Sequence, residues 1–363
     1  MNPSELRNRR EEIDRLDEEI VGLLHQRARV AQQIGALKDA SERGAYAPER
    51  ERQVLERVGA MEASGPLTGT HLIAIYRQII SACRALERSL RVAYFGPAAT
   101  FTHQAALERF GEATDLVPVP TIPDVFAETQ RGGVDFGVVP VENSTEGPVA
   151  HTLDLLIASP LRICAEISLP VRHCLLARSG GVRNVRRIVA HPQALAQCRG
   201  WLADHLPGVP TEPESSNARA AERAGGEAGV AAIAAEAAAE VYDLAVLARA
   251  IQDEPGNLTR FLVIGPQDVA QPSGDDRTSL VFTVRDEVGI LSSMLRPFAT
   301  YGIDLIKIES RPYRGRPWEY VFFLDLRGHR EEQRVQKALA GVERRALNLK
   351  ILGSYPAAPA AES

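Results

Sequence analysis

The sequence has few of the features that mark metal-, cofactor- and disulfide-dependent proteins. Its four cysteines are scattered with no C-x-x-C spacing, which argues against zinc and favours free thiols. The eight histidines form no H-x-x-x-H or H-E-x-x-H motif, so no metal is expected. The glycines form neither G-x-G-x-x-G after a strand nor G-x-x-x-x-G-K-[ST], so no dinucleotide or ATP cofactor is expected either.

Long apolar runs and a dominant charge of one sign are also absent. No run approaches the roughly 18 apolar residues that a membrane span needs, and the N-terminal residues have no apolar signal-peptide segment. The net charge of −5 provides no field that would gather nucleic acid or an anionic membrane. With 363 residues, 45% of them hydrophobic, the chain predicts a cytoplasmic protein of two or three domains.

Residues 1–90 predict an all-helical domain. Apolar residues from Ile13 to Leu37 recur at three- and four-residue steps, which indicates one long amphipathic helix. Glu49–Met61 is typical of a second helix, and Pro66 begins a third. Acidic and basic residues balance in this segment, which argues against a helical arm that binds DNA.

Cations interrupt the apolar seam of the first helix. Arg27 lies seven residues from both Ile20 and Ile34, and Lys38 lies close to the same face. Such a cation either reaches solvent, pairs with a glutamate across the bundle, or meets an anionic ligand. Arg10 borders the same seam but lies about 25 Å from Arg27 along a helix. One small ligand cannot reach both, so the hypothesis of a polyanion site includes a dimer in which Arg10 serves the partner chain.

The stretch Gly137–Gly147 reads as a buried strand that ends in hydroxyl and amide side chains. We expect a helix at Glu146–Leu156, whose first N–H groups face an anion. A well-capped loop without a ligand is an equal alternative.

Residues 91–265 predict a two-lobed α/β domain with a mostly parallel sheet and a ligand cleft between the lobes, because strand and helix patterns alternate. Polar residues where strands meet helices are the cleft candidates, although several also fit simple helix caps. They are Thr100, Phe101, Asn143, Ser144, Thr145, His191, Gln193, Gln197, Ser216, Asn217, Thr259, Arg260 and Phe261. No G-x-S-x-G motif is present, so acyl-transfer chemistry is not supported.

The last part of the chain predicts a small third domain. Residues 266–276 have linker composition, residues 277–355 have the element order βαββαβ of a ferredoxin-like fold, and residues 356–363 are expected to be a disordered tail.

The helical segment resembles the all-helical chorismate mutases through LRNRREEIDRLDEEIVGLLHQRARVAQQIGALK, PERERQVLERV and RQIISACRALE. The resemblance implies a substrate pocket formed by Arg10, Arg27, Lys38, Ala47, Arg50, Glu51, Cys83 and Glu87, with Lys38 and Glu87 at the ether oxygen. Glu87 stands where glutamine is frequent, and a carboxyl donates a hydrogen bond only when protonated. Mutase activity is therefore expected to fall as pH rises.

The second segment resembles prephenate dehydratases through VAYFGPAATFTHQAA, GVVPVENSTEG, AHPQALAQC, SSNARAAERA and IQDEPGNLTRFLVIG. This family has a fold like that of periplasmic binding proteins. Thr259 is expected to be the most critical residue, with Asn143, Arg260 and Phe261 also catalytic. Arg260 is expected to bind a substrate carboxylate, while the hydroxyl and amide side chains position the leaving hydroxide.

The third segment resembles the ACT domain of prephenate dehydratases through VRDEVGIL and KIESRP. The resemblance implies that phenylalanine binds there and inhibits the enzyme. The effector-binding residues are then Gly289, Ile290, Leu291, Glu309, Ser310, Arg311 and Pro312.

Together these resemblances predict a bifunctional enzyme of phenylalanine synthesis, which turns chorismate into prephenate and then into phenylpyruvate. We expect a homodimer, and pairing of dimers into tetramers stays open. Two alternatives remain: a ligand sensor with a solute-binding cleft and a degenerate helical arm, and a dehydratase whose mutase domain has decayed.

Overall fold

The chain forms two units, described here from a computed structural model that covers residues 3–37, 47–61, 65–87, 89–285, 287–312 and 320–358. The first unit comprises residues 1–90 and 110–115, and the second comprises residues 91–109 and 116–363. Lys38 and the final residues 359–363 lie outside the described residues. No helix in the described part of the chain is long and apolar enough to cross a membrane.

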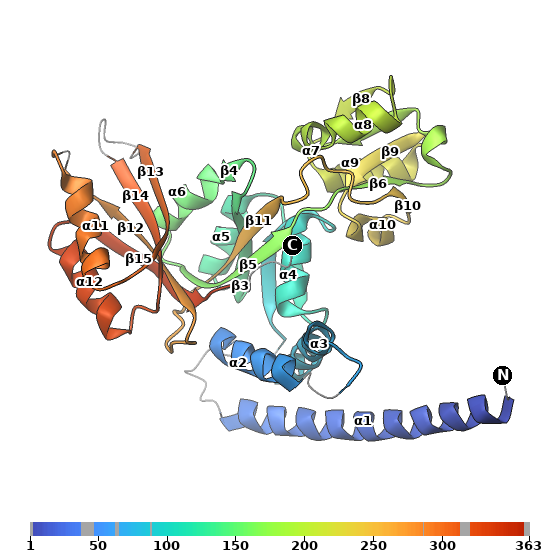
Figure 1. Cartoon of the computed structure of the whole chain (residues 1–363), viewed down its shortest axis with the longest axis horizontal. Coiled ribbons are helices and arrows are strands. Elements are labelled where there is room, and N and C mark those ends of the chain that lie inside the picture. The colour runs from blue at the N-terminus through green and yellow to red at the C-terminus, as the bar shows by residue number, and fades with distance from the viewer. Residues whose placement is uncertain are drawn as a thin grey trace. The chain divides into compact units, whose positions relative to one another are not determined.

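The first unit consists of helices, as its apolar periodicity predicts (Figure 1). They are α1 (Pro3–Leu37), α2 (Pro48–Gly59) and α3 (Gly69–Glu87). The apolar stripe of α1 stays largely exposed: Ile13 is 56%, Leu16 52%, Ile20 53% and Leu23 63% accessible. The described residues of this unit therefore leave most of that stripe uncovered.

The second unit begins with a sheet whose strand order is β2-β1-β3-β11-β5, with β4 beside β3. Its strands are β1 (Arg91–Phe95), β2 (Asp115–Val119), β3 (Phe136–Asn143), β4 (Gly147–Pro148), β5 (Arg162–Pro170) and β11 (Leu258–Gly265). Its helices are α4 (Phe101–Phe110), α5 (Ile122–Gln130) and α6 (Ala150–Ala158). The prediction of a mostly parallel sheet is wrong here, because the returning strand β11 runs antiparallel to both β3 and β5.

The helix expected at Glu146 begins instead at Ala150. Strand β3 continues to Asn143, whose side-chain Oδ1 accepts the backbone N–H groups of Thr145 and Glu146, both at 3.0 Å. Gly147, with φ of 82°, then turns the chain back into β4. The free N–H groups that we expected to face an anion are therefore consumed by Asn143, and the predicted helix-terminus site is wrong.

The second lobe has its own mixed sheet, of order β10-β6-β9-β7-β8. Its strands are β6 (Cys174–Ala177), β7 (Arg187–Ala190), β8 (Thr211–Pro213), β9 (Val230–Ala234) and β10 (Ala245–Ala248). Its helices are α7 (Pro192–Gln197), α8 (Arg199–His205), α9 (Asn217–Gly226) and α10 (Ala237–Val241). Alanines of α9 pack on β9 without side-chain bulk, which brings this helix close to the sheet.

The C-terminal part of the second unit has the predicted βαββαβ order, with strands arranged β13-β14-β12-β15. Its elements are β12 (Asp276–Thr283), α11 (Ile290–Thr300), β13 (Leu305–Pro312), β14 (Tyr320–Arg327), α12 (Gln333–Glu343) and β15 (Asn348–Pro356). Figure 1 shows both helices on one face of this sheet, where they cover its apolar core. Ala357 and Ala358, placed in the expected disordered tail, are held by hydrogen bonds to Asp275 and Glu166.

Candidate active sites

Polar side chains from both lobes of the second unit surround a cavity of about 90 Å³. Its lining combines the ends of β3 and β11 with α4, α7, α9 and the crossover before β6. The residues are Phe101, Asn143, Val171, His173, His191, Gln193, Ala194, Gln197, Asn217, Asn257 and Thr259. Seven of the residues predicted from the sequence therefore meet here: Phe101, Asn143, His191, Gln193, Gln197, Asn217 and Thr259.

Asn143 and Thr259 face each other across the β3–β11 ladder. Asn143 Nδ2 donates to Thr259 Oγ1 at 2.9 Å and to Asn257 Oδ1 at 2.7 Å. Because Asn143 Oδ1 is already occupied by two backbone N–H groups, the amide has one orientation only. Thr259 Oγ1 thus accepts a hydrogen bond from Asn143, and its own O–H proton stays available to a ligand.

Ser144 and Thr145 hold the turn rather than the cavity. Leu258 N donates to Ser144 Oγ at 2.9 Å, and Ser144 N donates to Leu258 O at 2.8 Å. Both side chains lie at exposed positions and neither lines the cavity. The contacts of Ser144 fix the end of β11 beside Asn143, which positions Thr259.

His173 is a cavity residue that the sequence reasoning missed. Only 2% of it is exposed, its Nε2 lies 2.9 Å from Gln197 Oε1, and its ring meets Phe101 edge-on at 5.6 Å. Burial lowers the pKa of His173 below its usual value, although the hydrogen bond to Gln197 partly opposes this shift. The imidazole is therefore neutral near pH 7. No motif surrounds His173 in the sequence, so only its position at the crossover could have suggested it.

Asn257 is the second residue that was missed. It is 3% exposed and links Asn143 to Gln197, to which its Nδ2 donates at 3.3 Å. Gln197 Oε1 accepts from both Asn257 and His173, which assigns the proton of His173 to Nε2 and leaves Nδ1 as an acceptor. Among the described residues, His173 Nδ1 and Gln197 Nε2 are buried without a hydrogen-bond partner, a costly arrangement unless a ligand completes it.

The second lobe contributes His191 and Asn217. Asn217 Oδ1 accepts from His191 N at 2.9 Å, and His191 Nδ1 accepts from Gln193 N at 3.3 Å. Each side chain therefore tethers the start of a helix, as the capping alternative predicted, while also lining the cavity.

In the helical unit, Glu51 is buried and pairs with Arg84, whose Nη1 lies 3.3 Å from Glu51 Oε2. Arg84 Nη2 also donates to Phe110 O at 2.6 Å, within the same unit. Arg84 was not predicted, because nothing in the spacing of RQIISACRALE distinguishes it. Glu51 thus has a partner on α3 that fixes its carboxylate.

Other predicted residues of this unit have varied surroundings. Cys83 is buried, and Glu87 packs against Gly35 of α1, where an added Cβ would lie 3.0 Å from Glu87 Cγ. Arg27 and Ala47 are half-buried, whereas Arg10 and Arg50 are exposed. Arg50 Nη1 donates to Gln53 Oε1 at 3.4 Å. The structure brings Gly35 and Glu87 together but places Arg10 about seven turns from Gly35 along α1.

Comparisons with known proteins match each part of the chain to one family. Residues 9–88 match chorismate mutase type II, residues 92–269 match prephenate dehydratase, and residues 278–344 match the ACT domain. A bifunctional chorismate mutase/prephenate dehydratase of Aquifex aeolicus is 47% identical and covers 98% of both chains. The chain belongs to the family of bifunctional chorismate mutase/prephenate dehydratases.

Two solved structures resemble the dehydratase and ACT parts. A prephenate dehydratase from Arthrobacter aurescens, solved in complex with L-Phe, is 36% identical with a TM-score of 0.68, and covers 74% of this chain and 90% of that one. A chain described as GqqA, a quorum quenching acylase, is 30% identical with the same TM-score, and covers 74% and 98%. The mutase, dehydratase and ACT domains of this bifunctional family are all present in the chain.

Arg260 and Phe261 do not enter the dehydratase cavity. Arg260 Nε lies 2.7 Å from Glu166 Oε2, its Nη1 lies 2.6 Å from Asp325 Oδ2 in the ACT domain, and the side chain is 15% exposed. The structure corrects the prediction that it binds a substrate carboxylate, because strand alternation turns it away from Thr259. Phe261 is 1% exposed and belongs to the core.

Thr100 and Ser216 act at helix starts outside the dehydratase cavity. Thr100 Oγ1 donates to Phe95 O or Pro97 O and accepts from His103 N at 3.2 Å. Ser216 Oγ accepts from Arg219 N at 3.1 Å, which caps α9. The capping alternative explains both residues.

The ACT signatures occupy a helix start and a strand. Gly289 precedes α11 in the left-handed conformation, with φ of 80°, and Ile290 and Leu291 are half-buried in its first turn. Along β13, Ser310 and Pro312 are exposed. Arg311 donates to Ala150 O at 2.7 Å and pairs with Asp154 at 3.0 Å, so this signature touches helix α6 of the dehydratase.

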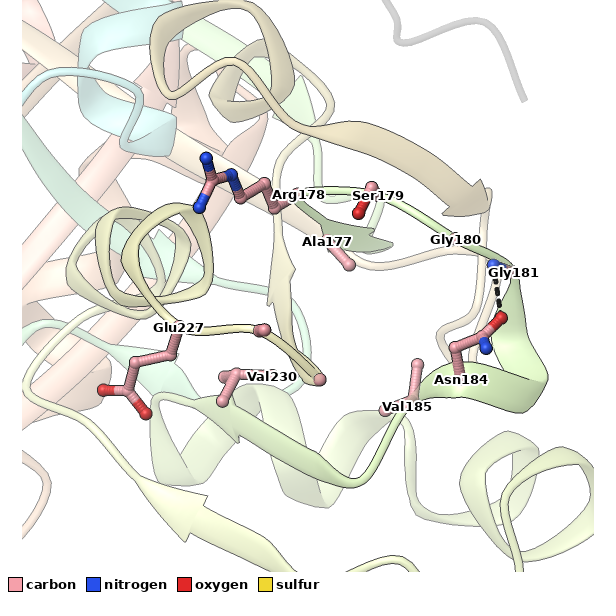
Figure 2. Close-up of a pocket in the computed structure, with 11 residues that line it drawn as sticks. Ala177, Arg178, Ser179, Gly180, Gly181, Asn184, Val185, Glu227 and Val230 are labelled. Atoms are coloured by element: carbon pink, nitrogen blue, oxygen red, sulfur yellow. Dashed lines mark hydrogen bonds between the residues drawn. The ribbon is translucent and has the colours of Figure 1, made fainter.

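A larger pocket of about 450 Å³ lies elsewhere in the second lobe, and Figure 2 shows its lining. Arg178, Gly180 and Gly181 follow β6, and Glu227 precedes β9. Asn184 Oδ1 accepts from Gly181 N at 3.1 Å, so its polar side chain is used within the loop. No residue of this pocket is among the predicted site residues.

Proposed function

We propose that the chain converts chorismate to prephenate in its helical unit and prephenate to phenylpyruvate in the cavity of Asn143 and Thr259. The observation that carries the second assignment is the oriented Asn143–Thr259 pair beside the unpartnered polar atoms of His173 and Gln197. Family membership supports both activities.

In the dehydratase reaction, the bond to the ring carboxylate breaks and its electrons enter the ring. The ring hydroxyl then leaves with its electron pair, and a proton converts it to water. Thr259 donates a hydrogen bond to the departing hydroxyl, because Asn143 already donates to Thr259 Oγ1. Asn143 is therefore a positioning residue for that proton, and the aromatic product supplies the driving force.

Neutral His173 and Gln197 offer the substrate an acceptor and a donor in a buried place. Gln197 Nε2 can donate to a substrate carboxylate or hydroxyl, and His173 Nδ1 can accept a hydrogen bond from a substrate hydroxyl. A positioned polar group in a water-poor site orients the reacting bonds and loses no reorganisation energy during reaction. Asn257 joins both residues to Asn143, so the four side chains act as one network.

The mutase reaction needs a pocket that holds a dicarboxylate in its reactive shape. We assign this role to Arg27, Lys38 and Arg50, with Glu87 and Lys38 at the ether oxygen, as the resemblance implies. We further propose a homodimer, in which Arg10 enters the partner's pocket. The exposed apolar stripe of α1 supports this proposal, because a second copy would bury it.

The ACT domain is proposed to bind L-phenylalanine at Gly289–Leu291 and Glu309–Pro312. The relative from Arthrobacter aurescens, solved with L-Phe, supports this assignment. The acylase description of the other relative is not transferred, because among the described cavity residues no histidine hydrogen-bonds a serine or threonine hydroxyl. Cytoplasmic location remains a proposal, consistent with the four free cysteines.

The test supplies chorismate to the pure protein and measures prephenate and phenylpyruvate by chromatography, with and without phenylalanine. We expect phenylpyruvate to form and phenylalanine to slow its formation. Accumulation of prephenate alone would contradict the dehydratase assignment, and unchanged chorismate would support the decayed-mutase alternative. Binding of phenylalanine without any turnover would support the ligand-sensor alternative.

A further inference from the structure

Two neighbouring steps of the β3–β11 ladder face opposite sides of the sheet. Thr259 pairs with Asn143, and the next residues, Arg260 and Glu142, also pair with each other. Successive strand side chains alternate between faces. The first pair therefore lines the dehydratase cavity, while the second reaches the ACT domain.

Arg260 is held by acceptors from two domains. Glu166 comes from strand β5 of the dehydratase, whereas Asp325 and Tyr355 come from the ACT strands β14 and β15. Burial alone would raise the pKa of Asp325, but Arg260 and Ser279 hold it below its usual value. Asp325 is therefore ionised, and the guanidinium cannot move without leaving a buried charge unpaired.

Glu142 continues this contact toward the effector signature. Lys307 Nζ lies 2.9 Å from Glu142 Oε1 and 3.4 Å from Glu309 Oε2. Glu309 is the third residue of the KIESRP signature, which begins at Lys307, and Arg260 Nη1 lies 3.9 Å from Glu142 Oε2. An unbroken row of alternating charges thus joins the ACT signature to the ladder step beside Asn143 and Thr259.

The ladder is irregular at this step. Phe261 pairs with Pro140, so Val141 is an extra residue on β3 opposite the Arg260–Phe261 junction. A bulge of this kind disrupts ladder hydrogen bonds and re-aims nearby side chains. A displacement of Arg260 or Glu142 is therefore more easily passed to Thr259 and Asn143 here than in a regular ladder.

We propose that Arg260 and Glu142 are positioning residues that transmit occupancy of the ACT signature to the Asn143–Thr259 pair, with Lys307 as the link. The proposal rests on the proposed dehydratase function and its inhibition by phenylalanine. When an effector at Glu309–Pro312 draws Lys307 or β14 away, Glu142 and Arg260 change partners, and the hydroxyl of Thr259 loses its orientation. The ACT domain then affects Asn143 and Thr259 through their neighbours in sequence, Glu142 on β3 and Arg260 on β11.

The sharpest variant is Lys307→Met, because Lys307 belongs neither to the cavity nor to the proposed effector residues. The matched control is Arg277→Gln. Arg277 forms an ion pair of 2.8 Å with Glu166 Oε2, the oxygen that Arg260 also contacts, but it lies on β12 and not on the β3–β11 ladder. Mutase activity of each variant serves as an internal check of folding. Phenylalanine binding is measured separately by calorimetry.

We expect Lys307→Met still to bind phenylalanine, but to have an effector-free dehydratase activity lowered toward that of the inhibited enzyme and to be inhibited further only in part. Arg277→Gln should give the wild-type inhibition curve. Glu142→Gln combined with Lys307→Met should change inhibition no more than the stronger single variant, because both substitutions remove the same ion pair between Lys307 and Glu142.

Arg260→Gln tests the positioning role directly. We expect kcat for prephenate to fall about tenfold with little change in KM, and Arg260→Lys to recover part of the loss. A Lys307→Met curve identical to that of Arg277→Gln, or loss of phenylalanine binding in Lys307→Met, would overturn the proposal. A wild-type protein that lacks dehydratase activity or inhibition would instead overturn the proposed function, so the two failures are distinguishable.

Discussion

The mutase and dehydratase regions differ in how much of each site a single chain supplies. The dehydratase cavity is built from side chains that are buried and hydrogen-bonded to one another, such as Asn143 and Asn257. In the mutase region, Arg10 is exposed and the apolar stripe of α1 is half accessible or more. The cavity of the dehydratase is formed by the fold of one chain, whereas the mutase pocket is proposed to be completed by a second copy.

This comparison implies that the boundaries of a domain do not decide whether its site is formed within one chain or needs residues of a second copy. The dehydratase network is organised by backbone pairing of β3 with β11, which is intrinsic to the chain. The proposed mutase site includes helix α1, whose apolar face is largely exposed among the described residues. We therefore expect the two activities to respond differently to mutation, dilution and pH.

The largest effect should come from a reciprocal pair of variants. Thr259→Ala removes the hydroxyl proposed to donate to the leaving group, and Arg27→Ala removes a cation from the mutase pocket. Each should lower its own activity by about 100- to 1,000-fold, by analogy with the loss of one preorganised electrostatic contact. Steady-state rates on chorismate and prephenate measure both, and loss of both activities in each folded variant would contradict separate sites.

Asn143→Ala should have the next largest effect. It frees the Thr259 hydroxyl and leaves Asn257 with fewer partners, so dehydratase turnover should fall about 10- to 100-fold while mutase activity is kept. The control is Asn184→Ala in the distant pocket of Figure 2, which should leave both activities unchanged. Equal losses in the two alanine variants would refute a specific role of Asn143.

The apolar stripe gives a dilution test. Leu16→Glu combined with Leu23→Glu would place charges where a second copy is proposed to pack, at a cost of about 1 kcal/mol or more for each leucine that the second copy would bury. Mutase specific activity of this variant should fall about tenfold on dilution, whereas dehydratase specific activity should not. Sedimentation at the same concentrations would report dissociation, and a monomer with full mutase activity would contradict the shared pocket.

The smallest and most diagnostic effect should be an opposite response to pH. The resemblance to chorismate mutases, in which Glu87 stands where glutamine is frequent, predicts a mutase activity that falls as pH rises, and Glu87→Gln should flatten that profile. In the dehydratase, burial lowers the pKa of His173, so the native state favours neutral imidazole. The stability that the neutral imidazole contributes to the native state is complete above the pKa of His173 in the unfolded chain. It is lost as pH falls through the lowered pKa of His173 in the native state.

Both profiles can be recorded on one preparation from about pH 5 to about pH 9, a range that spans the titration of histidine. His173→Gln keeps a polar side chain that does not titrate, and should remove the acidic limb of the dehydratase profile while lowering its plateau. An unchanged acidic limb in His173→Gln would assign that limb to another group. A mutase profile that is flat in the wild type would contradict the role of Glu87.

The sequence predicted the domains and most elements because periodicity depends on local pattern. The helix expected at Glu49–Met61 lies at Pro48–Gly59, and the expected βαββαβ order of residues 277–355 is present. The start of α6 was misplaced by four residues, because a side chain, Asn143, took the N–H groups of Thr145 and Glu146. Such side-chain competition with the backbone is not visible in periodicity.

The residues of the candidate site that lie in sequence motifs were predicted. The residues that only the fold brings to the cavity were missed. His173 and Asn257 are single residues at the two crossover strands, and each gains its meaning from a partner far away in sequence, Gln197 or Asn143. The misplacement of Arg260 was avoidable, since alternation along a strand already turns it away from Thr259. Arg84 needed the contact with Glu51 to be noticed at all.

Strand β15 lies against strand β5 at Gly353, where an added methyl group would clash with the backbone carbonyl oxygen of Ile163. No larger residue fits there without separating the two backbones. A regulatory domain borrowed from another protein could therefore dock only if it carried glycine at this position. The glycine at position 353 thus restricts which regulatory domains can replace the ACT domain of this enzyme. A hybrid enzyme that responds to another effector needs glycine at the matching position.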